Sequence, residues 1–136
     1  MSTKKTFLLI DDDPDDQEFF LEATKEVDEA IECSFASSCE EALETLKNKT
    51  DLPDYIFLDL NMPKVDGKKC LIEIKKLFHL QHIPVIIYST SSLKKDIEET
   101  ALLGAVYFLT KPSAFRELCS GIEKVLSLNL AAKMTK

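Results

Sequence analysis

The chain has 136 residues, the length of one domain, and no apolar run in it approaches the ~20 residues of a membrane span. Hydrophobic residues make up 45% and charged residues 30% of the sequence, a balance that excludes a disordered protein. The net charge of −7 disfavours direct binding of nucleic acid, because phosphate contacts rely on Lys and Arg. The whole excess of acid lies between Asp11 and Glu22, where seven acidic residues and no basic residue occur.

The N-terminus and the cysteines bear on the cellular compartment. The N-terminal sequence MSTKKTFLLI leads from four apolar residues directly into acid, which is unlike a signal peptide. No CxxC pair occurs among the four cysteines, which are Cys33, Cys39, Cys70 and Cys119. We therefore expect reduced thiols in a cytoplasmic protein.

The first elements in chain order are two strands and two helices. Residues 7–10 (FLLI) are an unbroken apolar run, typical of a strand buried on both faces of a parallel sheet. Pro14 suits the first turn of a helix that runs to about Val27. Residues 31–36 alternate between apolar and polar, which favours a strand nearer an edge. Ser38 and Glu41 form a capping box that opens the second helix.

Two further strands enclose the third helix. Residues 55–58 (YIFL) and 85–88 (VIIY) are again unbroken apolar runs. Between them, Asp66 can cap a helix that carries Leu71 and Ile74 on one face. These runs and this helix repeat the strand–helix order of the first half of the chain.

The last predicted elements are the fourth helix, the fifth strand and the fifth helix. Ser91 or Ser92 can open the fourth helix, which ends at Gly104, a residue suited to a positive φ. The apolar residues on one face of this helix are Leu93, Ile97 and Ala101. Residues 105–109 (AVYFL) predict a strand, and a helix follows Pro112. Its apolar residues recur at helical spacing, at Phe115, Leu118, Cys119, Ile122, Val125 and Leu126.

This order, strand then helix five times, predicts an open parallel sheet with helices on both faces, joined by right-handed crossovers. We expect residues 1–136 to form a single domain with its core at about residues 6–128, and no effector domain. Residues 129–136 form a short polar tail.

The polar residues that directly follow the strands are the candidate functional residues. In open parallel sheets, ligands bind beyond the carboxyl ends of the strands. Asp11 and Asp12 follow the first strand, Asp59 the third, Ser89 the fourth and Lys111 the fifth. Three carboxylates, a hydroxyl and an ammonium are therefore expected to converge at one end of the sheet.

Three clustered carboxylates repel one another unless a cation relieves them. Magnesium suits such a site, because it takes one or two carboxylates and shares its other positions with waters and a phosphate. A carboxylate beside Mg²⁺ and a Lys can attack phosphorus and form an aspartyl-phosphate. The pattern therefore indicates phosphoryl chemistry at Asp59.

Four segments, LLIDDDP, IFLDLNMPKVDG, PVIIYSTS and YFLTKP, resemble the signature regions of bacterial response regulator receiver domains. These domains are the phospho-acceptor modules of two-component signalling, and the resemblance spans about residues 7–126. It is to the stand-alone, chemotaxis-regulator-like type. It implies a flavodoxin-like (βα)5 three-layer sandwich with the parallel strand order 2-1-3-4-5.

The resemblance also implies roles for the acidic residues and their neighbours. Asp59 is similar to the phosphorylated aspartate. Asp12 matches the acid that binds Mg²⁺ (or Mn²⁺) directly, and Asp11 its neighbour, which acts mainly through a coordinated water. Asn61 would offer its backbone carbonyl to the metal.

The remaining matches concern the conformational switch that responds to phosphorylation in that family. Ser89 matches the hydroxyl that bonds the phosphoryl group, and Lys111 the lysine that pairs with it. Pro112 matches a proline whose peptide bond is often cis in that family. Phe108 takes the place of the aromatic residue that turns inward when the switch engages. Thr90 stands where a small residue is more usual and could narrow access to the phosphoryl group.

The resemblance implies partners as well. A sensor histidine kinase or a phosphotransfer protein would donate the phosphoryl group, and an unknown downstream protein would read the result. We expect no direct nucleic acid and no membrane partner. The surface of the fourth helix, fifth strand and fifth helix would carry the output and is where a homodimer could form. The protein would not be an enzyme beyond catalysing its own phosphorylation and dephosphorylation.

Other interpretations remain open for parts of the pattern. One alternative is a phosphatase with an aspartate nucleophile. Such an enzyme needs an acid two residues after the nucleophile, where this chain has Asn61, and 136 residues leave no room for a cap domain over a substrate. A receiver-like module that binds partners without phosphorylation is the other alternative. The acids of the first helical turn, Asp13, Asp15, Asp16 and Glu18, suit a positive helix end or a kinase-recognition surface. The HxxH pair His79 and His82 is expected at the opposite end of the sheet and is a poor metal site.

Overall fold

The computed structural model describes residues 5–48, 50–62 and 66–128. Residues 63–65, inside the predicted second signature segment, and the predicted polar tail lie outside the described part. Five parallel strands form one sheet in the order β2-β1-β3-β4-β5, as predicted. The strands are β1 (Thr6–Ile10), β2 (Glu32–Ala36), β3 (Tyr55–Leu58), β4 (Val85–Ser89) and β5 (Tyr107–Thr110).

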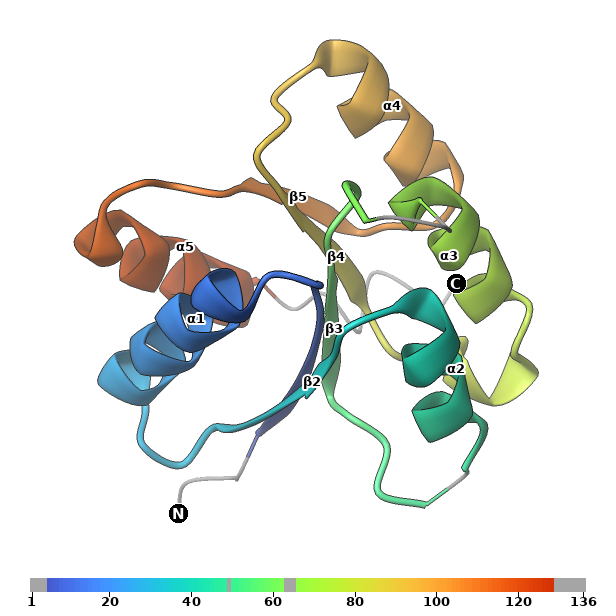
Figure 1. The fold of residues 1–136 in the computed structure, drawn as a ribbon, viewed down its shortest axis with the longest axis horizontal. Helices are drawn as coiled ribbons and strands as arrows, with labels where there is room; N and C mark the ends of the chain where they lie inside the picture. Colours follow the sequence, from blue (N-terminus) through green and yellow to red (C-terminus); the bar gives the residue numbers. More distant parts are fainter. Residues whose placement is uncertain (1–4, 49, 63–65, 129–136) are drawn as a thin grey trace.

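The helices lie in two layers, one on each face of the sheet (Figure 1). They are α1 (Pro14–Val27), α2 (Cys39–Lys47), α3 (Gly67–Lys75), α4 (Lys94–Leu102) and α5 (Phe115–Ser127), with a short 3-10 helix η1 (Phe78–Leu80) after α3. Helices α1 and α5 cover one face, and α2, α3 and α4 cover the other (Figure 1). The predicted three-layer α/β architecture is therefore confirmed.

Side-chain alternation along the strands produces two cores. Leu8, Ile56 and Ile87 point into the core beneath α2 and α3. Their neighbours in the chain, such as Phe7 and Phe57, point into the other core beneath α1 and α5. Because successive residues of a strand face opposite sides, a strand covered on both sides must be apolar throughout. This explains the unbroken hydrophobic runs in the sequence.

The predicted starts of the first three helices are confirmed. Pro14 is the first residue of α1. Ser38 Oγ accepts from the Glu41 N–H at 3.1 Å at the start of α2, and Asp66 accepts from the Lys69 N–H at 3.0 Å at the start of α3. Each side chain satisfies an N–H group that the helix itself leaves unpaired.

The fourth helix differs from its prediction. It starts at Lys94, and Ser91 Oγ accepts from the Leu93 N–H before the helix instead of capping it. Ile97 is 40% exposed, whereas Thr100 is fully buried. The Thr100 hydroxyl donates to the Asp96 carbonyl at 2.8 Å, so it can be buried without an external partner. The packed face of α4 is therefore centred on a polar residue that the apolar pattern did not indicate.

The prediction of four reduced cysteines is wrong for two of them. Cys39 in the first turn of α2 and Cys70 in α3 form a disulfide, with Cα atoms 5.7 Å apart. Cys33 and Cys119 are free. The two cysteines are 31 residues apart, so their spacing in the sequence did not predict the pair. Only the fold of the sheet brings α2 and α3 side by side. Within the described residues, no helix is both long and apolar enough to cross a membrane.

Candidate functional site

The site residues are held at the carboxyl ends of the strands by backbone hydrogen bonds that extend the sheet by one residue. The Asp11 N–H donates to the Ala36 carbonyl and the Asp59 N–H to the Ile10 carbonyl, both at 3.0 Å. The Lys111 N–H donates to the Ser89 carbonyl at 2.7 Å. Strand pairing therefore fixes where the backbone carries each functional side chain.

Asp11, Asp12 and Asp59 form the acidic centre, with one oxygen of each carboxylate within 4.8 Å of the others. Asp11 is fully buried, Asp59 is 4% exposed and Asp12 is exposed. Burial raises the pKa of both Asp11 and Asp59, against the lowering effect of Lys111 and of a backbone N–H bonded to each carboxylate. These N–H groups belong to Asp13 and Asn61. A nearby cation would therefore stabilise the ionised form of these two buried carboxylates.

Lys111 supplies a fixed cation to this centre. Its Nζ lies 2.8 Å from Asp11 Oδ2 and 3.4 Å from Asp59 Oδ2, and it also lies over the ring of Tyr88. Burial by itself lowers the pKa of Lys111, but the hydrogen bonds that Lys111 donates to Asp11 and Asp16 and the charge of Asp59 outweigh it, so the pKa is raised. Lys111 therefore stays charged over the whole neutral range.

Asp16 is a site residue that sequence reasoning missed. We expected it to face a helix end or a partner, but its Oδ2 lies 2.7 Å from Lys111 Nζ. Its place in the first turn of α1 was visible in the sequence, whereas the contact joins residues 95 positions apart. Only the tertiary structure brings the first turn of α1 within reach of the Lys111 side chain.

Ser89 lies at the end of β4, fully buried, and its Oγ accepts from the Ser91 N–H at 3.3 Å. Asn61 and Thr90 are exposed, and the Asn61 amide donates to Thr90 Oγ1 at 3.4 Å. The two loops that follow β3 and β4 are thus in contact beside Asp59. The Thr90 side chain lies at this junction.

Phe108 does not line the acidic centre. It is half-buried on β5 and lines a cavity of about 220 Å³ that also borders Ile97 and Thr100 of α4. The peptide bond between Lys111 and Pro112 is trans, so the cis bond suggested by the resemblance is not present. The two isomers of a bond before proline differ by only ~0.5–1 kcal/mol, so family precedent does not fix the choice.

Gly67, the first residue of α3, fixes the loop that follows Asp59. Its N–H donates to the Leu60 carbonyl at 2.9 Å. A Cβ at this position would overlap the carbonyl oxygen of Asp59. The absence of a side chain at Gly67 therefore lets α3 begin directly against the backbone of the acidic loop.

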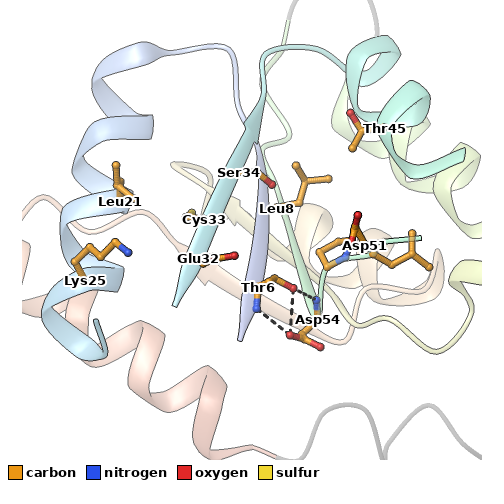
Figure 2. Close-up of a pocket in the computed structure, with 12 residues that line it drawn as sticks. Thr6, Leu8, Leu21, Lys25, Glu32, Cys33, Ser34, Thr45, Asp51 and Asp54 are labelled. Carbon is orange, nitrogen blue, oxygen red and sulfur yellow. Dashed lines mark hydrogen bonds between the residues drawn. The ribbon is translucent and has the colours of Figure 1, made fainter. Parts of the chain in front are cut away.

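A second hollow lies far from these residues. Figure 2 shows it at the opposite end of β1 and β2, where Asp54 accepts from the N–H and hydroxyl of Thr6. Its volume is about 790 Å³. It borders both sides of the edge strand β2, from Lys25 of α1 to Thr45 of α2 (Figure 2). None of the carboxylates that follow the strands lines it, so we do not assign it the chemistry of the acidic centre.

Asp11, Asp12 and Asp59 fit a hard divalent cation. They offer only oxygen ligands, and the exposed Asp12 leaves room for water on one side. Within the described ranges this trio is the sole group of three or more His, Cys, Asp or Glu residues close enough to share an ion. His79 bonds the Leu46 carbonyl at 2.7 Å instead, which is a packing role.

Residues 7–123 match the sequence model of the response regulator receiver domain. The probable C4-dicarboxylate response regulator DctR of Bacillus subtilis is 34% identical over 117 residues, which cover 86% of this chain and 50% of DctR. The chain thus spans about half the length of that relative.

Two solved structures are similar over nearly the whole chain. The phosphorylated cyanobacterial phytochrome response regulator RcpA has a TM-score of 0.81 at 30% identity, covering 90% of this chain and 91% of RcpA. The Mn²⁺-bound form of the response regulator Rcp1, a protein of Synechocystis, has a TM-score of 0.79 at 29% identity, covering 93% and 94%.

Proposed function

The chain belongs to the response regulator receiver domain family, and from this premise we propose that Asp59 accepts a phosphoryl group from a phosphohistidine. The donor would be a sensor histidine kinase or a phosphotransfer protein. The observation that carries the proposal is the convergence of Asp59 with Asp11, Asp12 and Lys111 at the carboxyl end of the sheet. Four side chains from three strand ends give one acceptor, two further acids and one fixed cation.

Asp11, Asp12 and Asp59 are the residues that would hold Mg²⁺ or Mn²⁺, together with the backbone carbonyl of Asn61. When bound, the cation would offset the charge of the transferring phosphoryl oxygens. Asp12 is exposed and is free to turn toward such an ion, whereas Asp11 is already bonded to Lys111 and to the Asp13 N–H. This supports a direct role for Asp12 and a role for Asp11 through a coordinated water.

In the transfer, a carboxylate oxygen of Asp59 attacks phosphorus and forms the new P–O bond. The P–N bond of the donor breaks, and the imidazole nitrogen leaves with its electron pair. The Asn61 N–H holds Asp59 Oδ1 at 3.2 Å, and Lys111 stands on the Oδ2 side. Lys111 and the hydroxyl of Ser89 would then donate to the phosphoryl oxygens.

The loop after Ser89 offers a route from this site to the surface of α4. The Ser91 hydroxyl donates to Asp96 at 2.5 Å, and Asp96 also pairs with Lys68 of α3 at 2.7 Å. A movement of Ser89 toward a phosphoryl group would pull on this link. The cavity beside Phe108 leaves space for rearrangement between α4 and β5. The output would be the binding of a downstream protein to the α4, β5 and α5 surface.

Mass spectrometry after incubation with acetyl phosphate and Mg²⁺ tests the proposal. The wild-type chain should gain the mass of one phosphoryl group, and Asp59→Asn should not. Asp15→Asn is the matched control, because it removes one exposed acid of α1 without changing the acceptor. Equal mass gain in wild type and Asp59→Asn would refute the assignment. No gain in any of the three proteins would instead favour a receiver that acts without phosphorylation.

A further inference from the structure

The ammonium of Lys111 lies within hydrogen-bonding distance of three carboxylates. Its Nζ lies 2.7 Å from Asp16, 2.8 Å from Asp11 and 3.4 Å from Asp59. A lysine ammonium has only three donors, so this set is complete. A phosphoryl group on Asp59 would bring up to about one further negative charge and new acceptor oxygens to the same ammonium. For Lys111 to bond these oxygens fully, one present partner must give way.

The three partners differ in what their release would cost. The Asp11 side chain is 0% exposed, and unpairing it would leave a buried charge without its cation. Asp59 carries the phosphoryl group and stays in place. The Asp16 side chain is 36% exposed and can turn to water without such a penalty. Asp16 is therefore the partner that can be exchanged.

We propose that Asp16 is a positioning residue that holds Lys111 while Asp59 is unphosphorylated and releases it to the phosphoryl group. It contacts Lys111 and is not one of the three acids that could hold a metal. Its charge opposes phosphorylation in two ways, because it competes for the ammonium and repels the incoming anion. Asp16 would thus favour the unphosphorylated form and tie the first turn of α1 to the state of the site.

This inference rests on the proposed function, and beryllofluoride, an analogue of the phosphoryl group, tests the two separately. Calorimetric titrations at saturating Mg²⁺ would compare wild type with Asp16→Asn, Asp16→Glu and Asp15→Asn. Asp15 lies next to Asp16 in the same helical turn and is exposed, so its variant controls for net charge and helix effects.

We expect Asp16→Asn to bind beryllofluoride about fivefold more tightly than wild type, the size of one partly exposed ion pair. Asp15→Asn should change little, and Asp16→Glu should restore the wild-type affinity by returning the carboxylate. Asp16→Ser carries the same expectation as Asp16→Asn, and serves if the amide variant does not fold. Weaker binding by Asp16→Asn, or a change no larger than that of Asp15→Asn, would overturn the role of Asp16. Absence of binding in wild type would count against the proposed function itself.

Discussion

The Nζ atom of Lys111 lies 3.4 Å from Oδ2 of Asp59, so the ammonium that follows β5 reaches across the end of β4 to the carboxylate that follows β3. This contact crosses the sheet between two strands that are not neighbours. It places a cation beside a buried acid, and we expect both the stability of the site and its proposed phosphoryl chemistry to depend on this contact.

Replacing Lys111 with Met should destabilise the metal-free protein. The change leaves the buried Asp11 and Asp59 without their cation, and the expected loss in the free energy of unfolding is about 3 kcal/mol. Mg²⁺ should return more stability to this variant than to wild type, because it would then be the main cation of the site. Urea denaturation with a chelator, and then with Mg²⁺, measures both effects.

Lys94→Met is the matched control for Lys111→Met. Lys94 is exposed, and its Nζ lies 3.8 Å from Glu98 on the surface of α4. Its loss should change stability by less than ~1 kcal/mol. Equal destabilisation by the two variants would contradict the special role of the buried cation.

Replacing Asp59 with Asn should stabilise the metal-free protein near neutral pH. Burial raises the pKa of Asp59, so between its usual pKa and the raised one the folded state holds the proton more tightly than the unfolded state. The free energy of unfolding of wild type therefore falls as the pH rises through that window, and it stays lower above it. Asp59→Asn lacks this loss and should therefore be the more stable of the two proteins at about pH 7.

The advantage of Asp59→Asn should shrink as the pH falls through the raised pKa of Asp59, because the wild-type carboxyl then becomes neutral. Asp11 also has a raised pKa, but it is present in both proteins and its effect largely cancels. Urea midpoints measured in chelator at several pH values give the comparison. A difference between the two proteins that does not vary with pH would argue that charge burial at Asp59 is not its cause.

Replacing Gly67 with Ala should disturb the acidic loop. The new Cβ would overlap the backbone of Asp59 and Leu60, and backbone atoms cannot move aside as a side-chain tip can. The expected cost is about 2–3 kcal/mol of stability, together with weaker binding of Mg²⁺. Thermal unfolding and metal titration measure these two quantities.

Gly121→Ala provides the comparison for Gly67→Ala. Gly121 lies within α5, and a Cβ there would meet only the end of the flexible Leu109 side chain. Alanine is also favoured over glycine inside a helix by ~1 kcal/mol. The second change should therefore be close to neutral and leave Mg²⁺ binding intact. Similar losses in both variants would mean that the contact of Gly67 with Asp59 is not critical.

Reducing the Cys39–Cys70 disulfide should lower the stability of the protein. Closing a loop of about 31 residues restricts the unfolded chain, and the expected effect is roughly 3–4 kcal/mol. A reductant should lower the urea midpoint of wild type and of a Cys33→Ser, Cys119→Ser double variant alike. Thiol counting in denaturant should detect two free thiols before reduction and four after it. Four free thiols in the untreated protein would show that the disulfide does not form.

The sequence determined the strands and the polar positions that follow them, and the order of the strands in the sheet came from the family resemblance. The runs at residues 7–10, 55–58 and 85–88 are short, local and apolar throughout, so they predict buried parallel strands without knowledge of the rest of the chain. Because parallel strands end on the same side of the sheet, Asp11, Asp59 and Lys111 could be grouped from their order alone. The caps at Ser38 and Asp66 were predictable for the same reason, since a cap depends on residues within one helical turn.

Only the tertiary structure decided which side chains touch across long sequence separations. The contact of Asp16 with Lys111 joins residues 95 positions apart, and the Cys39–Cys70 bond joins residues 31 positions apart. The sequence also did not predict that the apolar side of α4 is exposed. Thr100 can be buried in its place, because its hydroxyl is hydrogen-bonded within its own helix. Sequence periodicity reports what one segment needs to bury, but which residues meet depends on how separate segments pack. The position of the site could therefore be predicted from local sequence, whereas the partners of Lys111 depend on tertiary packing.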